Sequence, residues 1–337
     1  ALNGAIYSTA IGYAALQAVT TGDYNTALGA STLNALTSGA ANLAIGQKAL
    51  YTHTTGSRNI AIGDGAMDDT NAGSTSLGSN DNVFIGVDSG GGTWANAASQ
   101  YNIAIGNNTM DDAMNGAESN VAVGHNALGT LSSGTSNIAI GANAGLTIGA
   151  GIRNIVIGHY AGDAMGTQDE CVLIGYESGS ALNHDDADGT VAIGYQAGNA
   201  LTSGGGNTAV GYRAGLANTT GSYNTAVGYN AFITANENDN DGSVAIGYDA
   251  LRVKAGTGGA QYATSSTAVG FQAGVAESTG GQNTFIGFKA GNLVSTGTTN
   301  VIIGHDADVD ANSRVGCIVI GAGLSLNTAS DNVVEIG

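Results

Sequence analysis

The chain contains no proline, and only 10% of its 337 residues are charged. Proline lacks a backbone N–H group and is confined to the edges and bulges of sheets, so its absence suits a fold in which almost every N–H group joins a ladder. Apolar residues nevertheless make up 42% of the chain, which is too many for a disordered Gly/Ser tract. The composition therefore favours an ordered β structure.

Long apolar runs and basic residues are also scarce. No segment approaches 18 consecutive apolar residues and the N-terminus has no basic signal region, so we expect no membrane insertion. The chain has only eight Lys and Arg but 26 Asp and Glu, which gives a net charge of −18. This charge argues against nucleic acid as a partner. Because the chain begins without Met, we expect the domain to be truncated at one or both ends.

Glycine, in contrast, is abundant and periodic. A five-residue motif of the type Asn-Thr-Ala-Val-Gly recurs nineteen times, mostly at intervals of seventeen residues. A short period that runs end to end is typical of a solenoid, so we predict a single repeat domain over 1–337. The motif glycines, numbered zero in each repeat, are Gly12, Gly29, Gly46, Gly63, Gly86, Gly106, Gly124, Gly141, Gly158, Gly175, Gly194, Gly211, Gly228, Gly247, Gly270, Gly287, Gly304, Gly321 and Gly337.

The three residues before each motif glycine predict a short strand. Position −1 is Ile, Val or Leu in every copy, position −3 is Thr, Ile, Val or Leu, and position −2 is usually Ala. Alternate residues of a strand point to opposite faces, so both faces of this strand are apolar. One face can fill the coil, while the other needs cover from a second chain. Which face does which remains open, although small Ala at −2 suits close approach to a symmetry axis.

Position −4 is Asn in twelve copies, which predicts a ladder of side-chain amides along successive coils. The glycine of a Ser/Thr-Ser/Thr-Gly-x-x-Asn pattern, such as Gly56, is expected to have a positive φ. Two short strands and two turns then complete each coil of an all-β parallel solenoid of about 19 coils. The predicted ladder residues are Asn25, Asn42, Asn59, Asn82, Asn102, Asn120, Asn137, Asn154, Asn207, Asn224, Asn283 and Asn300.

The repeat Asn-Thr-Ala-Ile/Val-Gly-Tyr-x-Ala-Gly/Leu, followed by Thr-Thr-Gly, resembles the head repeats of YadA-like trimeric autotransporter adhesins and, more closely, repeats of bacteriophage tail fibres. The resemblance covers the whole chain and implies a left-handed parallel β-roll that forms a homotrimeric rod. The adhesin repeats are usually shorter, and no stalk or membrane anchor is present in this sequence. Its end, 331–337, is similar to the exit of a tail-fibre repeat array towards a chaperone or tip domain.

Few residues suggest chemistry. The five histidines are scattered, and the three at position +1 (His125, His159 and His305) belong to different coils, so we expect neither a metal site there nor an enzyme. Cys171 and Cys317 both replace Asn at position −4, eight coils apart, which is too far for a disulfide within one chain.

Two features indicate binding. Position +1 is aromatic in seven consecutive coils, a stripe that sugar rings could stack on or that could cover a seam between chains. Two acidic loops, 184–189 and 237–242, resemble the first half of a calcium loop, although the distal Glu is missing. An insertion over 88–100 carries Trp94 and is expected to bulge outward. The aromatic residues are Tyr176, Tyr195, Tyr212, Tyr229, Tyr248, Phe271 and Phe288, and the candidate calcium ligands are Asp186, Asp188, Asp239 and Asp241.

The sequence thus predicts an extracellular structural or adhesive protein that binds a host-surface receptor, with a glycan as the candidate ligand. The primary hypothesis is the shaft or receptor-binding region of a trimeric phage tail fibre on a virion. The alternatives are a YadA-like adhesin head on a bacterial surface and a secreted filament. An ice-binding solenoid is disfavoured, because the Thr residues at position −3 are too often replaced by Ile and Val.

Overall fold

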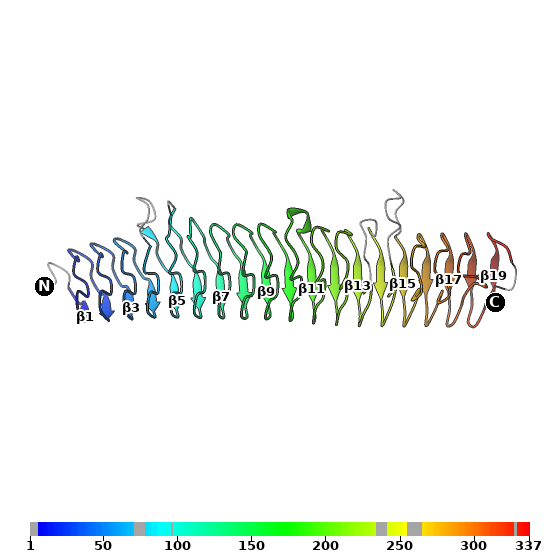
Figure 1. The fold of residues 1–337 in the computed structure, drawn as a ribbon, viewed down its shortest axis with the longest axis horizontal. Helices are drawn as coiled ribbons and strands as arrows, with labels where there is room; N and C mark the ends of the chain where they lie inside the picture. Colours follow the sequence, from blue (N-terminus) through cyan, green and yellow to red (C-terminus); the bar gives the residue numbers. More distant parts are fainter. Residues whose placement is uncertain (1–5, 71–77, 96, 234–240, 255–264, 327–328) are drawn as a thin grey trace. The chain divides into compact units, whose positions relative to one another are not determined.

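The structure, a computed structural model, describes residues 6–70, 78–95, 97–233, 241–254, 265–326 and 329–337. Its contacts divide the chain into Ala1–Glu170 (unit 1) and Cys171–Gly337 (unit 2). In both units each coil contributes one three-residue strand (Figure 1). Unit 1 contains β1 (Thr9–Ile11), β2 (Thr26–Leu28), β3 (Leu43–Ile45), β4 (Ile60–Ile62), β5 (Val83–Ile85), β6 (Ile103–Ile105), β7 (Val121–Val123), β8 (Ile138–Ile140) and β9 (Ile155–Ile157). Unit 2 contains β10 (Val172–Ile174), β11 (Val191–Ile193), β12 (Thr208–Val210), β13 (Thr225–Val227), β14 (Val244–Ile246), β15 (Thr267–Val269), β16 (Thr284–Ile286), β17 (Val301–Ile303), β18 (Ile318–Ile320) and β19 (Val334–Ile336).

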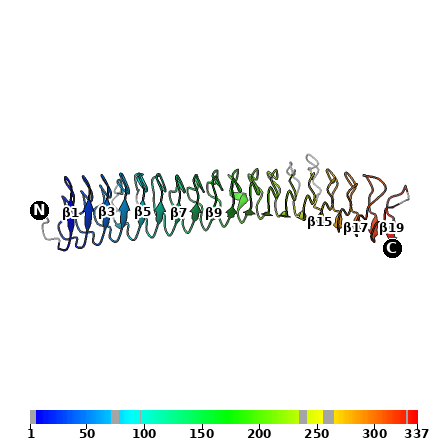
Figure 2. The same cartoon turned by 90° about the horizontal axis from the view of Figure 1, so that it is seen from below.

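Within each unit, every strand pairs in parallel with the strand of the next coil. The register joins equivalent repeat positions, as in Ala104 opposite Ala122 and Ala209 opposite Ala226. The predicted all-β parallel solenoid with a period of about seventeen residues is therefore confirmed. The prediction of two strands per coil was wrong for the described residues, because a single strand is followed by a long returning series of turns (Figure 2). None of the helices described is long and apolar enough to cross a membrane.

The two faces of the strand have different surroundings. The side chain at position −2 is buried in every strand from β2 to β18, whereas those at −3 and −1 are half-buried or exposed. Ala209, for example, is 5% exposed, while Ile246 at position −1 is 39% exposed. Position −2 therefore faces the interior of the coil. The suggestion that its small alanines approach a symmetry axis was wrong, and the outward apolar surface consists of positions −3 and −1.

The interior is filled by pairs of residues of complementary size at positions −2 and +4. Phe285 at −2 lies against Gly291 at +4, where an added Cβ would come within 2.1 Å of the phenylalanine ring. Conversely, Ala122 at −2 accompanies the buried Leu128 at +4. Since protein interiors are close-packed, a large residue at one position requires a small residue at the other. This requirement explains the alternation of glycine and bulky residues at +4.

Glycines allow neighbouring coils to approach closely. The motif glycines of the first eighteen coils have φ between 129° and 150°, and a Cβ on Gly211 would lie 2.5 Å from the carbonyl oxygen of Gly228. Gly56 does not have a positive φ, contrary to expectation; the left-handed residue of that turn is Arg58, at 59°. Gly56 is required instead because a Cβ there would lie 2.1 Å from the carbonyl oxygen of Ser79 in the next coil.

The predicted asparagines lie inside the coils and hydrogen-bond to one another. In unit 1 they form an uninterrupted series from Asn25 to Asn154, hereafter the asparagine ladder. The Oδ1 atom of Asn102 accepts the backbone N–H (3.1 Å) and the Nδ2–H (3.0 Å) of Asn120. In unit 2 the corresponding position is, in successive coils, Cys171, Thr190, Asn207, Asn224, Ser243, Ser266, Asn283, Asn300, Cys317 and Val333. The serines continue the series. Ser243 Oγ accepts the backbone N–H of Ser266, and Ser266 Oγ accepts the backbone N–H of Asn283.

Three other residues occupy interior sites. Cys171 and Cys317 are buried in the asparagine position, so their side chains face the coil interior. Trp94 was expected on a bulging loop, but it is fully buried against Phe84, with ring centroids 5.6 Å apart. Its Nε1–H donates to the carbonyl of Gly90 at 3.0 Å. The insertion at 88–100 thus extends the core with this side chain rather than displaying it.

Candidate binding surface

The aromatic residues predicted at position +1 of unit 2 form one continuous stack, hereafter the aromatic ladder. Each residue directly follows a motif glycine, so the coil spacing sets the distance between rings. Neighbouring ring centroids lie 4.8–5.3 Å apart, and neighbouring ring planes differ by 8–10°. The ladder contains Tyr176, Tyr195, Tyr212, Tyr229, Tyr248, Phe271, Phe288 and His305.

His305 is a member of the ladder that the sequence analysis missed. Its ring stacks on Phe288 at 4.8 Å, and its Nδ1 lies 3.2 Å from Oδ2 of Asp306. The signal was present, because His305 occupies position +1, but the residue was considered only as a metal ligand. The stack ends there, since the next coil has Ala322 in this position.

The ladder presents ring edges to solvent rather than ring faces. Its tyrosines and phenylalanines are 37–46% exposed, yet each inner ring has a neighbouring ring on both sides. Inserting a sugar between two rings would need about 3.5–4 Å of contact distance on each side, or about 7–8 Å in total, whereas the centroids are at most 5.3 Å apart. Sugar rings therefore cannot enter between the rings, and a ligand would meet ring edges and tyrosine hydroxyls.

A row of polar side chains runs beside the ladder at position +2. Its residues share a left-handed backbone with φ of 49–54°, which fixes their direction after the strand. Gln196 Nε2 donates to Glu177 at 2.8 Å, and Arg213 Nε donates to Gln196 at 3.1 Å. Arg213 and Lys289 also lie over ladder rings, each 5.3 Å from a centroid. This row, hereafter the polar row, consists of Glu177, Gln196, Arg213, Asn230, Asp249, Gln272, Lys289 and Asp306.

Among the residues of unit 1 that the structure describes, none form an equivalent of the ladder. The +1 residues of this unit include Gln47, Asp64, Asn107 and His125, although its strands and asparagines follow the same pattern. His125 of unit 1 occupies the repeat position that holds Tyr195 and Tyr212 in unit 2. Coil formation therefore does not need an aromatic residue at +1. The ladder is a specific feature of unit 2.

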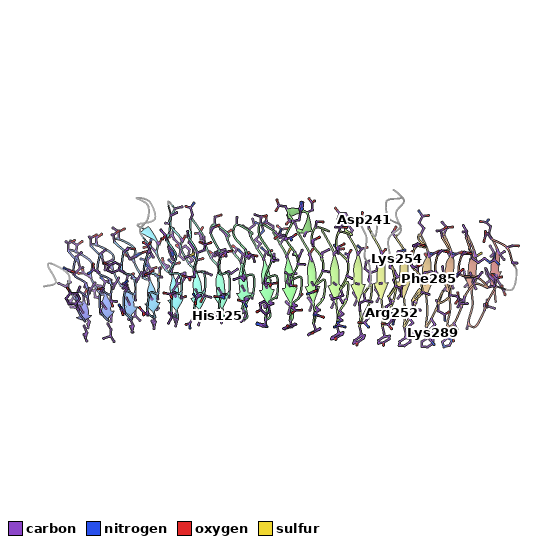
Figure 3. The ribbon with its side chains drawn as sticks, viewed as in Figure 1. His125, Asp241, Arg252, Lys254, Phe285 and Lys289 are labelled. Atoms are coloured by element: carbon purple, nitrogen blue, oxygen red, sulfur yellow. The ribbon has the colours of Figure 1, made fainter. Side chains whose placement is uncertain are left out.

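Asp241, one of the candidate calcium ligands, lies away from this surface. In unit 2 Asp241 is at the edge of the coil opposite Lys289 (Figure 3). The first acidic loop folds as the short 3-10 helix η2 (Asp185–Ala187), capped by His184, and leaves Asp186 and Asp188 exposed. Asp241 Oδ1 accepts the N–H of Ser222 at 2.6 Å, and Asp239 lies outside the described residues. In the part of the chain that the structure describes, no three His, Cys, Asp or Glu side chains gather as metal ligands. Calcium binding stays a prediction.

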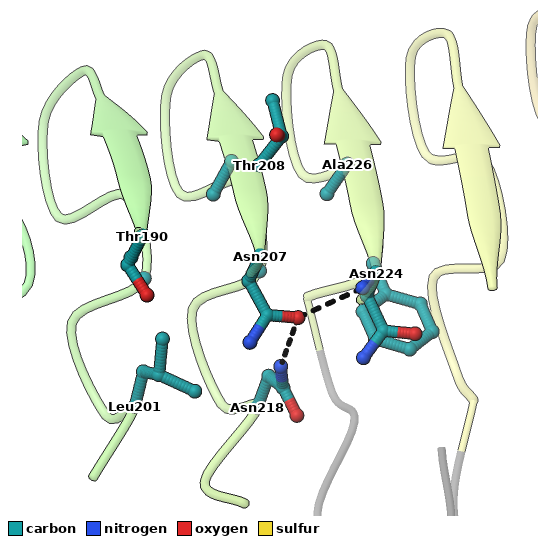
Figure 4. Close-up of a pocket in the computed structure, with 11 residues that line it drawn as sticks. Thr190, Leu201, Asn207, Thr208, Asn218, Asn224 and Ala226 are labelled. Carbon is teal, nitrogen blue, oxygen red and sulfur yellow. Dashed lines mark hydrogen bonds between the residues drawn. The ribbon is translucent and has the colours of Figure 1, made fainter. Parts of the chain in front are cut away.

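A small interior cavity in unit 2 follows from two successive small pairs. Positions −2 and +4 are Ala192 with Gly198 and Ala209 with Gly215, so neither position carries a large side chain in these two coils. The resulting space is about 10 Å³, which is about the room that one water molecule needs. Figure 4 shows Asn207 beside it, accepting from the backbone N–H of Asn224 and from Asn218. A cavity of this size accommodates no substrate.

His53 is a buried titratable group in unit 1. Its Nδ1 lies 2.9 Å from Thr70 Oγ1, and its Nε2 lies 3.2 Å from Asn59 Nδ2. Burial lowers the pKa of His53 to about 4. The folded protein therefore holds this side chain neutral.

Acidification is expected to destabilise unit 1 through His53. An unfolded histidine titrates near pH 6.5 and the folded one near 4, so the unfolded state binds more protons between these values. The contribution of neutral His53 to the free energy of unfolding is complete above about pH 6.5. It falls as the pH falls, by about 2 kcal/mol between pH 7 and pH 5. Denaturant unfolding of the wild type and His53→Met at both pH values measures the effect; Met165 is the natural residue at the same repeat position. The variant should lose this pH dependence.

Two properties make that comparison decisive. Burial raises the pKa of Asp308 in unit 2 to about 6, so its contribution has the opposite sign and is lost as the pH rises from about 4 to 6. Asp308 is unchanged in His53→Met, so the difference between the two proteins isolates the histidine. Equal pH dependence in the wild type and variant would assign the acid response to other groups.

Comparison with protein-family models and with curated proteins finds no match for the chain.

Proposed function

We propose that the protein is a structural and adhesive fibre: the shaft or receptor-binding region of a homotrimeric bacteriophage tail fibre, located on the virion. The observation that carries the proposal is the outward apolar surface of the strands. In each unit, positions −3 and −1 form continuous rows of half-buried or exposed residues that are mostly Ile, Val, Leu and Thr. Ile103, Ile105, Ile138 and Ile140 are each 37–41% exposed. We call positions −3 and −1 the outer rows.

The outer rows favour association of identical chains. Soluble monomers rarely expose a contiguous apolar patch larger than a few hundred Å². A cyclic trimer, with its symmetry axis between the three chains and parallel to them, would bury the same rows of all three chains at once. Both units have these rows, so each unit could associate in the same way. The resemblance of the repeats to trimeric fibres supports the same stoichiometry.

The aromatic ladder is the receptor-binding surface in this proposal. It occurs only in unit 2, whereas the outer rows occur in both units, so a function other than association explains it best. Tyrosine hydroxyls and the polar row offer hydrogen-bond donors and acceptors at each coil. A linear glycan lying along the ladder would contact them repeatedly through its hydroxyl groups. The net charge of −18 favours a neutral or cationic glycan over an acidic one.

Sedimentation velocity and small-angle scattering of the native chain test the proposal. We expect a single species with three times the 33.0 kDa chain mass. We also expect it to be elongated, because nineteen coils at about 4.8 Å would make a rod of about 85–90 Å. Circular dichroism should show β structure that persists on dilution. A folded, soluble monomer at micromolar concentration would contradict the proposed trimer and therefore the assignment as a trimeric fibre.

A further inference from the structure

Lys254 has an unusual position for a lysine, because it lies inside a coil of unit 2 (Figure 3). Both Lys254 and Glu277 have no exposed surface. They occupy position +7 of their repeats, where other coils place buried apolar residues such as Leu201 and Val294. Lysine and glutamate are almost never fully buried unless they are paired. This pair has therefore replaced apolar core residues at two successive coils.

The Glu277 carboxylate accepts hydrogen bonds from the side-chain nitrogens of Lys254 and Asn283, one on each oxygen. Lys254 Nζ donates to Oε1 and to the carbonyl oxygen of Gly280. Asn283 Nδ2 donates to Oε2 at 3.3 Å, and Ser266 Oγ donates to Oε1 at 2.7 Å. An amine, a carboxylate and a carboxamide thus meet in a site closed to solvent. We call Lys254, Glu277 and Asn283 the buried triad.

The environment of the triad favours an uncharged amine. Taking an ammonium and a carboxylate out of water costs several kcal/mol per ion, and their attraction repays this only in part. Burial lowers the pKa of Lys254, which brings transfer of its proton to Glu277 within reach. A neutral lysine amine is a nucleophile. The only carboxamide carbon on the same carboxylate is Cγ of Asn283, among the contacts described for Glu277.

We propose that Lys254 and Asn283 form an intramolecular amide bond between Nζ and Cγ, with Glu277 as the proton carrier. Glu277 takes a proton from the Lys254 ammonium, and Nζ then attacks Cγ. A second proton passes from Nζ through the Glu277 carboxyl to Nδ2, the Cγ–Nδ2 bond breaks and ammonia leaves. Ammonium, carboxylate and carboxamide become amide, carboxylic acid and ammonia, so atoms and charge balance without an oxidant or cofactor.

The product retains the hydrogen bonds that the interior requires. Asn283 Oδ1 remains an acceptor for the N–H (2.8 Å) and Nδ2–H (3.1 Å) of Asn300. The one remaining N–H can donate to Glu277 or to the carbonyl of Gly297, which Nδ2 contacts at 2.8 Å. The two buried charges disappear. The new bond links the coils of β14 and β16, where Ser243 and Ser266 replace two consecutive asparagines. It therefore reinforces the stretch in which amide-to-amide bonds are interrupted.

Whole-protein mass spectrometry of the purified, denatured chain tests the proposal. We expect the mass to be lower than the sequence mass by one ammonia, and proteolysis to yield a branched peptide joining the segments around Lys254 and Asn283. Glu277→Gln should have the full sequence mass, since it removes the proton carrier. Lys254→Arg should also have the full mass while it keeps a cation beside Glu277, so this variant covers the case in which Glu277→Gln does not fold.

Two controls exclude other causes of the same mass change. An asparagine that cyclises with its own backbone also loses ammonia, but that product opens in mild base whereas the proposed amide does not. Lys289→Met removes an exposed lysine of unit 2 and should leave the loss of ammonia unchanged. A wild-type chain with full sequence mass after prolonged incubation at elevated temperature, or one without the branched peptide, would overturn the proposal.

Discussion

Replacing Val210, Val227 and Ile246 together by aspartate is expected to abolish the trimer. These residues occupy position −1 of β12, β13 and β14, where their side chains point outward in three successive coils. In the trimer each would be buried against another chain. Nine carboxylates would then lose water among outer rows that contain only Ile, Val, Leu and Thr, so no cation of these rows could pair with them. An unpaired buried charge costs several kcal/mol even after relaxation. The loss should therefore be complete.

Sedimentation velocity at matched concentrations measures this effect. The wild type should sediment as a trimer, and the triple variant as a monomer or as non-specific aggregates. Ala200→Asp, Ser203→Asp and Ala217→Asp together form the matched control, because these residues lie in the turns of the same unit and outside the strands. The control adds the same charge and should remain trimeric. A triple strand variant that sediments like the wild type would show that the outer rows do not form the interface.

A second comparison separates assembly from folding. Aspartate at Ala209, Ala226 and Ala245 should prevent folding itself, because these side chains point into the coil and are at most 5% exposed. Circular dichroism should then show loss of β structure in the alanine series and its retention in the monomers of the −1 series. Aspartate at two adjacent positions of one strand is thus expected to have different effects: at −2 it prevents folding, and at −1 it prevents only assembly. Their difference follows directly from the alternation of side chains along a strand.

The period of the sequence was sufficient to predict the strand before each motif glycine and the asparagine ladder. Repetition at seventeen residues places the same residue type at the same height in each coil, so a strand at Ile103–Ile105 implies one at Val121–Val123. Which face of the strand points into the coil was not predictable, since Ala104 and its neighbours Ile103 and Ile105 are all apolar. Only the packing of −2 against +4 distinguishes the interior from the outer rows. The residue adjacent to the asparagine, such as Arg58, has the positive φ, whereas Gly56 is required by the close approach of the next coil.

The candidate site was predictable in composition but not in orientation. Position +1 identified the aromatic residues, yet the 8–10° between ring planes depends on side-chain rotamers that a repeat pattern does not specify. His305 was overlooked because it was classified by its ability to bind metal rather than by its ring. Lys254 and Glu277 are 23 residues apart, with an insertion between them. Aligning them on their motif glycines, at position +7, would have placed them in adjacent coils.

Asn102→Ala in unit 1 is expected to cause the largest loss of stability from a single side chain. Asn102 makes four buried hydrogen bonds through its amide, including those from Nδ2 to Asn82 Oδ1 (3.2 Å) and to the carbonyl of Ala117 (2.9 Å). Its Oδ1 accepts two from Asn120. Each buried polar group left without a partner costs about 1–3 kcal/mol, so we expect a decrease of about 3–5 kcal/mol in the free energy of unfolding. Urea denaturation followed by circular dichroism measures this decrease.

Two variants identify which atoms of Asn102 matter. Asn107→Ala is the matched control: it removes an exposed amide whose Oδ1 accepts one bond, from the N–H of Val87 at 3.0 Å, and should change stability by less than about 1 kcal/mol. Asn102→Ser should fall between the two, because Ser243 and Ser266 show that a hydroxyl oxygen at this position can still accept the N–H of the next coil. If Asn102→Ala is no more destabilising than Asn107→Ala, the strands and the interior packing hold the coils together without the asparagine ladder. If Asn102→Ser equals the wild type, the side-chain oxygen alone accounts for the stabilisation, and the amide nitrogen contributes nothing measurable.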